Sequence, residues 1–147
     1  MIFLIQHNEG QVSIFFLAIF GNLPYLLYFI WIYSIAKYTT QALVAKNITI
    51  NFLLFQKIFL VLCMVLFVFP ILQILFVKGV HTYIMLPVAL IFMPIFFYCL
   101  VFTTKSFKML ELNRKVKYSD YGDFFLGILF FPIGIWFIQP KLNKLKY

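Results

Sequence analysis

The acidic side chains are the first place to look for chemistry, because the chain has only four. Glu111 and Asp120 lie on either side of Arg114, and Asp123 follows one helical turn later. Acids grouped beside a long apolar run would suit an enzyme that acts on lipids. Helix caps and solvated ion pairs explain the same four residues more simply. We therefore predict a cytoplasmic polar cluster of these residues and no catalytic residue.

Two amide side chains lie inside apolar runs. Asn22 belongs to the segment Gly21-Asn22-Leu23-Pro24, and Gln73 lies near the end of another run. An amide in hydrocarbon costs free energy unless it is hydrogen-bonded. Each therefore predicts either a contact between helices or a contact with an ion or substrate. The sequence favours packing for both.

The metal-binding residue types show no useful spacing. His7, Glu9 and His81 fall on separate segments, without the close pairs of a zinc motif. Cys63 and Cys99 both lie inside apolar runs, where free cysteines behave as small buried hydrophobes. We expect no metal and no cofactor.

The elements that position these residues are apolar helices. The chain is 65% hydrophobic and 11% charged, against roughly 25% charged in soluble domains. A helix needs about 20 apolar residues to cross a bilayer, and three runs reach that length. We predict a single all-α domain over residues 1–147, a polytopic membrane helix bundle with four apolar segments. They cover about 11–36, 52–77, 80–104 and 120–139.

The fourth segment is short, and proline and glycine interrupt it. We predict a break over Phe131–Gly134, because Pro132 has no N–H to donate to the carbonyl of Ile128. That carbonyl should then face the protein or a polar pocket. Trp136 and Gln139 lie beside the break, which makes it the expected contact point for a partner or ligand. Helix length favours a segment that crosses the membrane, whereas charge favours one that turns back, and both remain open.

Basic residues set the expected orientation, since they collect on the cytoplasmic side. The turn at Lys78 carries one cation, whereas the stretch around Arg114 carries several, so that stretch should be cytoplasmic. If the fourth segment turns back, eleven of the twelve cations share one side. A net charge of +8 placed in this way indicates lipid headgroups and not nucleic acid.

The connections carry further local signals. The first and third helices are expected to continue past their apolar runs, and the short link at Lys78 makes the second and third helices antiparallel neighbours. Glu111 and Lys115 stand four residues apart, in the order that favours a helical ion pair. Ser119 or Asp120 is expected to cap the next helix.

The C-terminal third resembles a family of small integral membrane proteins of Bacteroidetes-type bacteria, to which no activity is assigned. The resemblance implies a bacterial inner-membrane protein with four apolar helices, and it implies no site. It rests on Leu110-Glu111, Lys117, Ser119-Asp120, Phe124-Phe125 and the run Phe131-Pro132-Ile133-Gly134-Ile135-Trp136-Phe137-Ile138-Gln139-Pro140-Lys141-Leu142-Asn143.

These features predict a small non-catalytic membrane protein of the bacterial inner membrane that packs with other membrane helices or with copies of itself. The short connections support this, because they leave little chain outside the apolar runs. An oligomeric pore or small transporter is the first alternative, suggested by the prolines and Asn22. A lipid-modifying enzyme is the second.

Overall fold

The computed structural model describes the backbone of residues 2–75 and 81–145, and within these the side chains of 21–68, 87–130 and 134–145. The described chain is entirely helical, without a strand. Its five helices are α1 (Ile2–Ala45), α2 (Phe52–Leu75), α3 (His81–Leu112), α4 (Tyr118–Leu129) and α5 (Phe131–Lys144).

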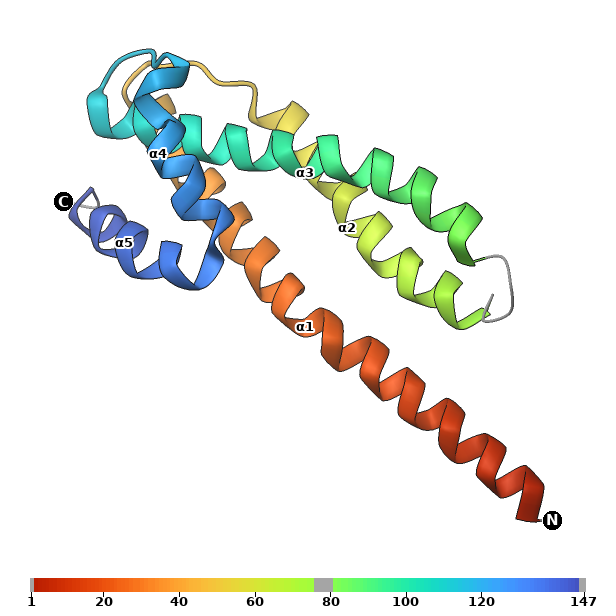
Figure 1. Cartoon of the computed structure of the whole chain (residues 1–147). Coiled ribbons are helices and arrows are strands. Elements are labelled where there is room, and N and C mark those ends of the chain that lie inside the picture. Colours follow the sequence, from red (N-terminus) through yellow and green to blue (C-terminus); the bar gives the residue numbers. More distant parts are fainter. Residues whose placement is uncertain (1, 76–80, 146–147) are drawn as a thin grey trace.

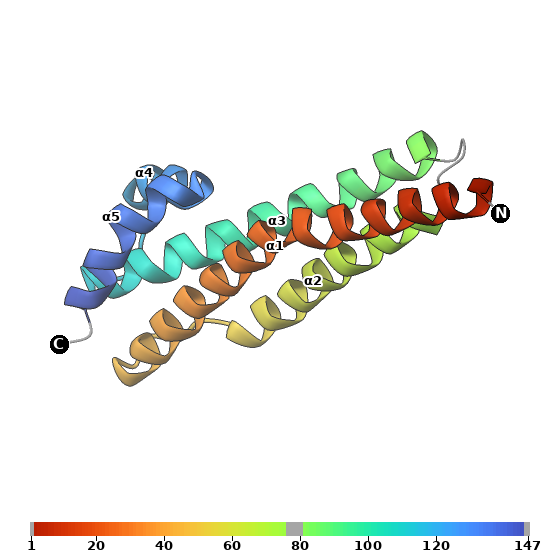
Figure 2. The ribbon, with the colours of Figure 1, turned by 90° about the horizontal axis from the view of Figure 1, so that it is seen from below.

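Three long helices form a bundle, and two short ones cover one end of it. Helices α1, α2 and α3 share a common long direction, with α2 and α3 running antiparallel beside each other (Figure 2). The first half of α1 diverges from the α2–α3 pair (Figure 1). Helices α4 and α5 lie at the end opposite the N-terminus, where α1 and α3 end and α2 begins.

Polar residues define the helix ends at this end of the bundle. As expected, the first and third helices continue past their apolar runs, and left-handed asparagines follow them, with φ of 59° at Asn47 and 51° at Asn113. Asparagine tolerates this conformation better than most residues, and it commonly terminates helices. Asn51 caps the start of α2, because its side-chain oxygen accepts a hydrogen bond from the Leu54 N–H at 3.1 Å.

The predicted cap of the fourth helix is wrong by two or three residues. Lys117, and neither Ser119 nor Asp120, is the N-cap of α4. Asp120 lies in the first turn, and its Oδ2 accepts the Lys117 N–H at 2.9 Å. A carboxylate at this position also faces the positive end of the helix dipole, so it stabilises the start of α4 from inside the helix.

The core lies in the half of the molecule where all five helices meet. Ile32 of α1 and Leu100 and Phe107 of α3 are buried there, and Phe107 stacks on Phe124 of α4 with ring centroids 4.3 Å apart. On the other side of α3, Phe55 of α2 stacks on Phe102 at 4.5 Å. The core is therefore built around α3, and it ties α4 to the long helices.

Large apolar side chains also cover much of the outer surface. Leu53, Leu90 and Phe137 are 71%, 67% and 68% exposed. Among the described side chains, the segment Pro87–Leu112 is long and apolar enough to cross a membrane, and Phe52–Val68 is apolar but shorter. This supports association with a membrane.

Candidate functional site

The predicted break between α4 and α5 is present, one residue earlier than expected. Helix α4 ends at Leu129, and α5 begins at Phe131 after Phe130, which has φ −90° and ψ 69°. Pro132 lies in the first turn of α5, where a missing N–H leaves no helical hydrogen bond unmade. The chain turns back here, so that α4 and α5 form a hairpin (Figure 1). The chain therefore reverses direction at the break, as the turn-back alternative requires.

The carbonyl freed by Pro132 is satisfied from the first helix. The Tyr28 hydroxyl donates a hydrogen bond of 2.9 Å to the Ile128 carbonyl oxygen. Both residues are buried, at 7% and 0% exposure. The expectation that this carbonyl faces the protein is confirmed. The bond joins residues 100 positions apart and holds the break of the hairpin against α1.

The two arms of the hairpin approach so closely that only glycine fits at their contact. A Cβ added to Gly134 would lie 1.9 Å from the carbonyl oxygen of Gly127. Beyond this contact, Ile138 and Leu142 of α5 pack into the core that contains Phe124. The hairpin is therefore a packed unit.

Two lysines lie close to the ring of Phe124. Lys108 Nζ of α3 and Lys141 Nζ of α5 lie 5.1 and 5.3 Å from its centroid, within the range of a cation–π interaction. These contacts bring the end of α5 back to the end of α3. The hairpin therefore returns the C-terminal part of the chain to the level at which α4 begins.

The predicted polar cluster exists as two separate ion pairs. Glu111 pairs with Lys108 and not with Lys115, because α3 ends at Leu112 and Lys115 lies beyond the helix. Arg114 pairs with Asp120 at 3.1 Å, across the connection between α3 and α4.

The third acid of the cluster, Asp123, has no described ion pair, and the second, Asp120, has a shifted pKa. Asp123 is exposed, and no ion pair is described for it. The Lys117 backbone N–H, followed by Arg114, lowers the pKa of the Asp120 carboxyl. The arrangement brings no two carboxylates together, and it suits structural pairing.

Basic residues gather at one end of the molecule. The described side chains include ten of the twelve basic residues, since Lys78 and Lys146 lie outside them. All ten lie in the half where α1, α3 and α5 end and α2 and α4 begin. The turn of the hairpin, at Phe130, carries no charge and points away from this end. The fold therefore concentrates positive charge at one level and leaves the hairpin apolar.

A seam of small hydroxyl residues joins α1 to α3. Thr39 Oγ1 and Ser106 Oγ lie 2.9 Å apart and are fully buried. Thr103 and Thr104 are buried beside them and donate to the carbonyls of Cys99 and Leu100 in their own helix. Sequence reasoning missed this seam because its residues lie at or beyond the ends of the apolar runs. The signal that could have found it is the group of small hydroxyl residues on α3, in which Thr103 and Ser106 are three residues apart and so share a helix face.

The remaining predicted residues do not form one site. Asn22 is half-buried in α1, which continues unbroken through Pro24, and it is not without a partner. Trp136 is 81% exposed on α5, and Gln139 is exposed on the same helix. The side chains of Gln73 and Pro132 lie outside the described residues, as do those of His7, Glu9 and His81.

The cysteines and metal-binding groups complete the inventory of reactive side chains. Cys99 is buried and Cys63 is half-buried, and both are free. Among the described residues, no three His, Cys, Asp or Glu side chains come close enough to hold a metal ion.

The comparisons with known proteins add no family to these observations. No family model, no curated protein and no solved structure matches this chain. The resemblance carried by the C-terminal run therefore stays a prediction, and function has to be inferred from geometry.

Proposed function

We propose that this chain is a non-catalytic, multi-pass protein of the bacterial inner membrane that packs with other membrane helices. Helices α1, α2 and α3 cross the bilayer, and α4 and α5 enter it from the cytoplasmic side as a re-entrant hairpin. The observation that carries the proposal is the Tyr28–Ile128 hydrogen bond. It satisfies the carbonyl of Ile128 at the break, and a broken helix is tolerated at membrane depth where its backbone groups find such partners within the protein.

Charge placement supports the same orientation. The ten described cations lie at one end, and the positive-inside rule assigns that end to the cytoplasm. The hairpin contributes Lys141 and Lys144 to this level, whereas its turn at Phe130 is apolar. A hairpin that dips into the bilayer and returns explains why both of its ends are charged and its middle is not.

Packing, and not conduction, fits the polar groups inside the bundle. The buried hydroxyls of Thr39 and Ser106 bond each other, and those of Thr103 and Thr104 bond carbonyls of their own helix. These four hydroxyls are satisfied by hydrogen bonds within the bundle, which supports packing over conduction. On the outside, Trp136 and Gln139 of α5 are exposed, so a neighbouring membrane helix or a second copy can contact both side chains.

Impermeant thiol labelling in intact cells tests the topology. The parent for this test carries Cys63→Ala and Cys99→Ala, so that each added cysteine is the only one. Cysteines placed at Arg114 and Lys144 should both stay unlabelled until the cells are opened, whereas one at Lys78 should label at once. Labelling at 144 but not at 114 would show a crossing segment and overturn the re-entrant arrangement.

Crosslinking in membranes tests the packing role. Trp136→Ala with Gln139→Ala should reduce a crosslinked complex of the protein with a second membrane helix or a second copy. The matched control is Leu90→Ala with Met93→Ala, which removes two exposed apolar side chains from α3 and should leave the complex intact. If the unsubstituted protein forms no crosslinked complex, and if it conducts ions or solutes after reconstitution, the packing role is wrong and the protein is a pore.

A further inference from the structure

A cavity of about 560 Å³ lies at the basic end of the bundle, beside α3. One wall comes from α3, and the connections after α1 and after α3 supply the others. Its size falls within the range of small-molecule sites. Its lining mixes apolar, hydroxyl, amide and basic groups, namely Thr49, Ile50, Asn51, Tyr98, Val101, Phe102, Lys105, Ser106, Met109, Lys115 and Val116.

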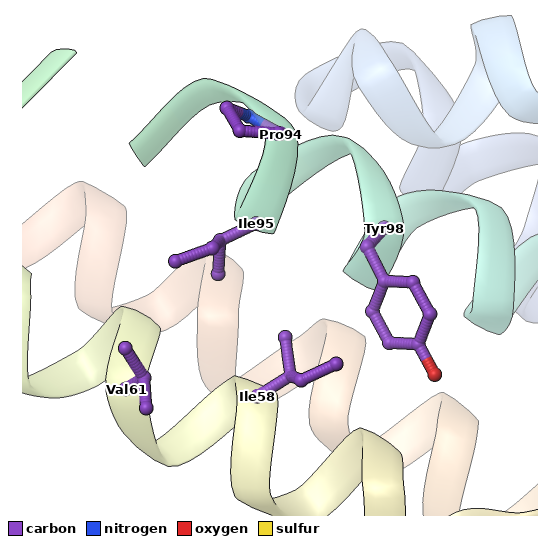
Figure 3. A pocket seen from close by; sticks show the side chains of 5 residues that line it. All are labelled: Ile58, Val61, Pro94, Ile95 and Tyr98. Atoms are coloured by element: carbon purple, nitrogen blue, oxygen red, sulfur yellow. The ribbon is translucent and has the colours of Figure 1, made fainter. Parts of the chain in front are cut away.

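An apolar groove of about 290 Å³ continues from this cavity between α2 and α3. Ile58 and Val61 of α2 and Ile95 of α3 approach each other across it, and Tyr98 lies at the end away from Val61 (Figure 3). Pro94 of α3 also lines the groove. Tyr98 lines both hollows, so the groove and the cavity are neighbours at this residue. The groove is apolar, and the cavity beside it carries basic groups toward the end of the bundle.

The length of this site matches one leaflet of a bilayer. Pro94 and Lys105 are eleven residues apart on the continuous helix α3. At 1.5 Å per residue the separation is about 16 Å, which is close to half of a hydrocarbon core roughly 30 Å thick. A molecule whose charged group lies at Lys105 would therefore reach the middle of the bilayer with an extended chain in the groove.

The end of the site at Lys105 and Lys115 carries positive charge that no described acidic side chain neutralises. Lys105 and Lys115 are exposed, and among the described residues neither ammonium group has a carboxylate partner. The described lining contains no acidic side chain. Two other lysines of this region are engaged elsewhere, Lys108 with Glu111 and Lys46 with Asn113.

We propose that this site binds one anionic glycerophospholipid of the cytoplasmic leaflet, with its phosphate at Lys105 and Lys115 and one acyl chain between Ile58 and Ile95. The inference rests on the proposed membrane topology, and it names a specific lipid site within it. Tyr98 and Asn51 offer a hydroxyl and an amide at the level of the glycerol and ester groups. The lipid would fill the space that the α2–α3 contact leaves open.

Lipid titration of the purified full-length protein, followed by native mass spectrometry, tests the site. The probes are phosphatidylglycerol, phosphatidylcholine with the same acyl chains, and free glycerol phosphate. A lysine near an anionic lipid contributes about fivefold to affinity, so Lys105→Gln with Lys115→Gln should weaken phosphatidylglycerol binding about 30-fold. Lys37→Gln with Lys144→Gln removes the same charge away from the site and should leave the affinity unchanged.

A second variant tests the groove independently of charge. Ile95→Trp places a larger ring where the acyl chain would lie, and it should weaken binding of both lipids alike. Helix content and thermal stability without added lipid show that each variant is folded, and the lysine substitutions are exposed and should not change either.

Three results would overturn the proposal. They are equal affinity for the two lipids, equal affinity in the two lysine double variants, and competition by glycerol phosphate, which would mark a site for a free phosphate. Each can occur in a protein that still resists alkaline extraction from membranes. Release of the protein by alkaline extraction would instead contradict the proposed membrane function, so the two failures are distinguishable.

Discussion

Two helix contacts in this molecule differ in how they are made. Helices α1 and α3 meet through the hydroxyls of Thr39 and Ser106, whereas α4 and α5 meet through the backbones of Gly127 and Gly134. The hydroxyl contact is a hydrogen bond between two side chains, and a side chain of similar size can take the place of either one without a steric clash. The glycine contact depends on empty space, and any side chain at Gly134 would occupy the place of a backbone atom. The hairpin should therefore be the more fragile contact.

Gly134→Ala should produce the largest effect. The added Cβ would lie 1.9 Å from the Gly127 carbonyl oxygen, so α4 and α5 must separate. Overpacking of a rigid contact costs about 3 kcal/mol at the upper end of measured values. Equilibrium unfolding in detergent measures the change in the free energy of unfolding. Gly122→Ala, in the same hairpin, is the control, because nothing lies within 4 Å of its Cβ. It should raise stability by about 0.5–1 kcal/mol, and an equal loss in both variants would contradict the glycine contact.

Tyr28→Phe should have the next largest effect. It removes the donor to the buried Ile128 carbonyl, and an unsatisfied buried group costs about 1–3 kcal/mol. Tyr38→Phe is the matched control, since its hydroxyl donates to the Leu145 carbonyl over 3.3 Å in a half-buried position. A smaller loss is expected there. Equal losses of unfolding free energy would mean that the Tyr28 bond does not hold the break.

The hydroxyl seam should tolerate substitution better than the hairpin. In a double-mutant cycle, Thr39→Val and Ser106→Ala should show a coupling energy of about 0.6 kcal/mol, the average for side-chain hydrogen bonds between membrane helices. The cycle uses the unfolding free energies of the two single variants and the double variant. If the coupling energy is as large as the loss of unfolding free energy in Gly134→Ala, the prediction that the hairpin contact is the more fragile is wrong.

The smallest effect should occur at the start of α4. The lowered pKa of Asp120 means that its stabilisation is complete above the unfolded pKa, about 3.9, and is lost as the pH falls through the lower folded value. The protection factor of the Lys117 amide, which removes the pH dependence of intrinsic hydrogen exchange, should therefore be constant from pH 5 to 8 and should fall only under stronger acid. Asp120→Ala should lower this protection factor throughout, whereas Asp123→Ala should not. A protection factor that changes between pH 5 and 8 would contradict this pairing.

The sequence-based predictions succeeded where the cause is local. The α4–α5 break follows from the missing N–H of Pro132, and the extension of α3 follows from the amphipathic pattern after its apolar run. The predicted Glu111–Lys115 pair failed because the helix ended three residues too early for it, at Leu112. The seam at Thr39 and Ser106 was missed because both residues lie beyond the apolar runs, and only the packing of α1 against α3 brings them together.

The sequence by itself determined the helical segments, the concentration of basic residues and the position of the break. These follow from hydropathy, charge and the chemistry of one imino acid, all of which act within a few residues. Only the tertiary structure decided that the broken segment turns back, and that Tyr28 supplies the donor for Ile128. The same holds for the space that α2 and α3 leave beside Tyr98. These features depend on groups far apart in the chain, and the interactions between those groups form only once the helices have packed.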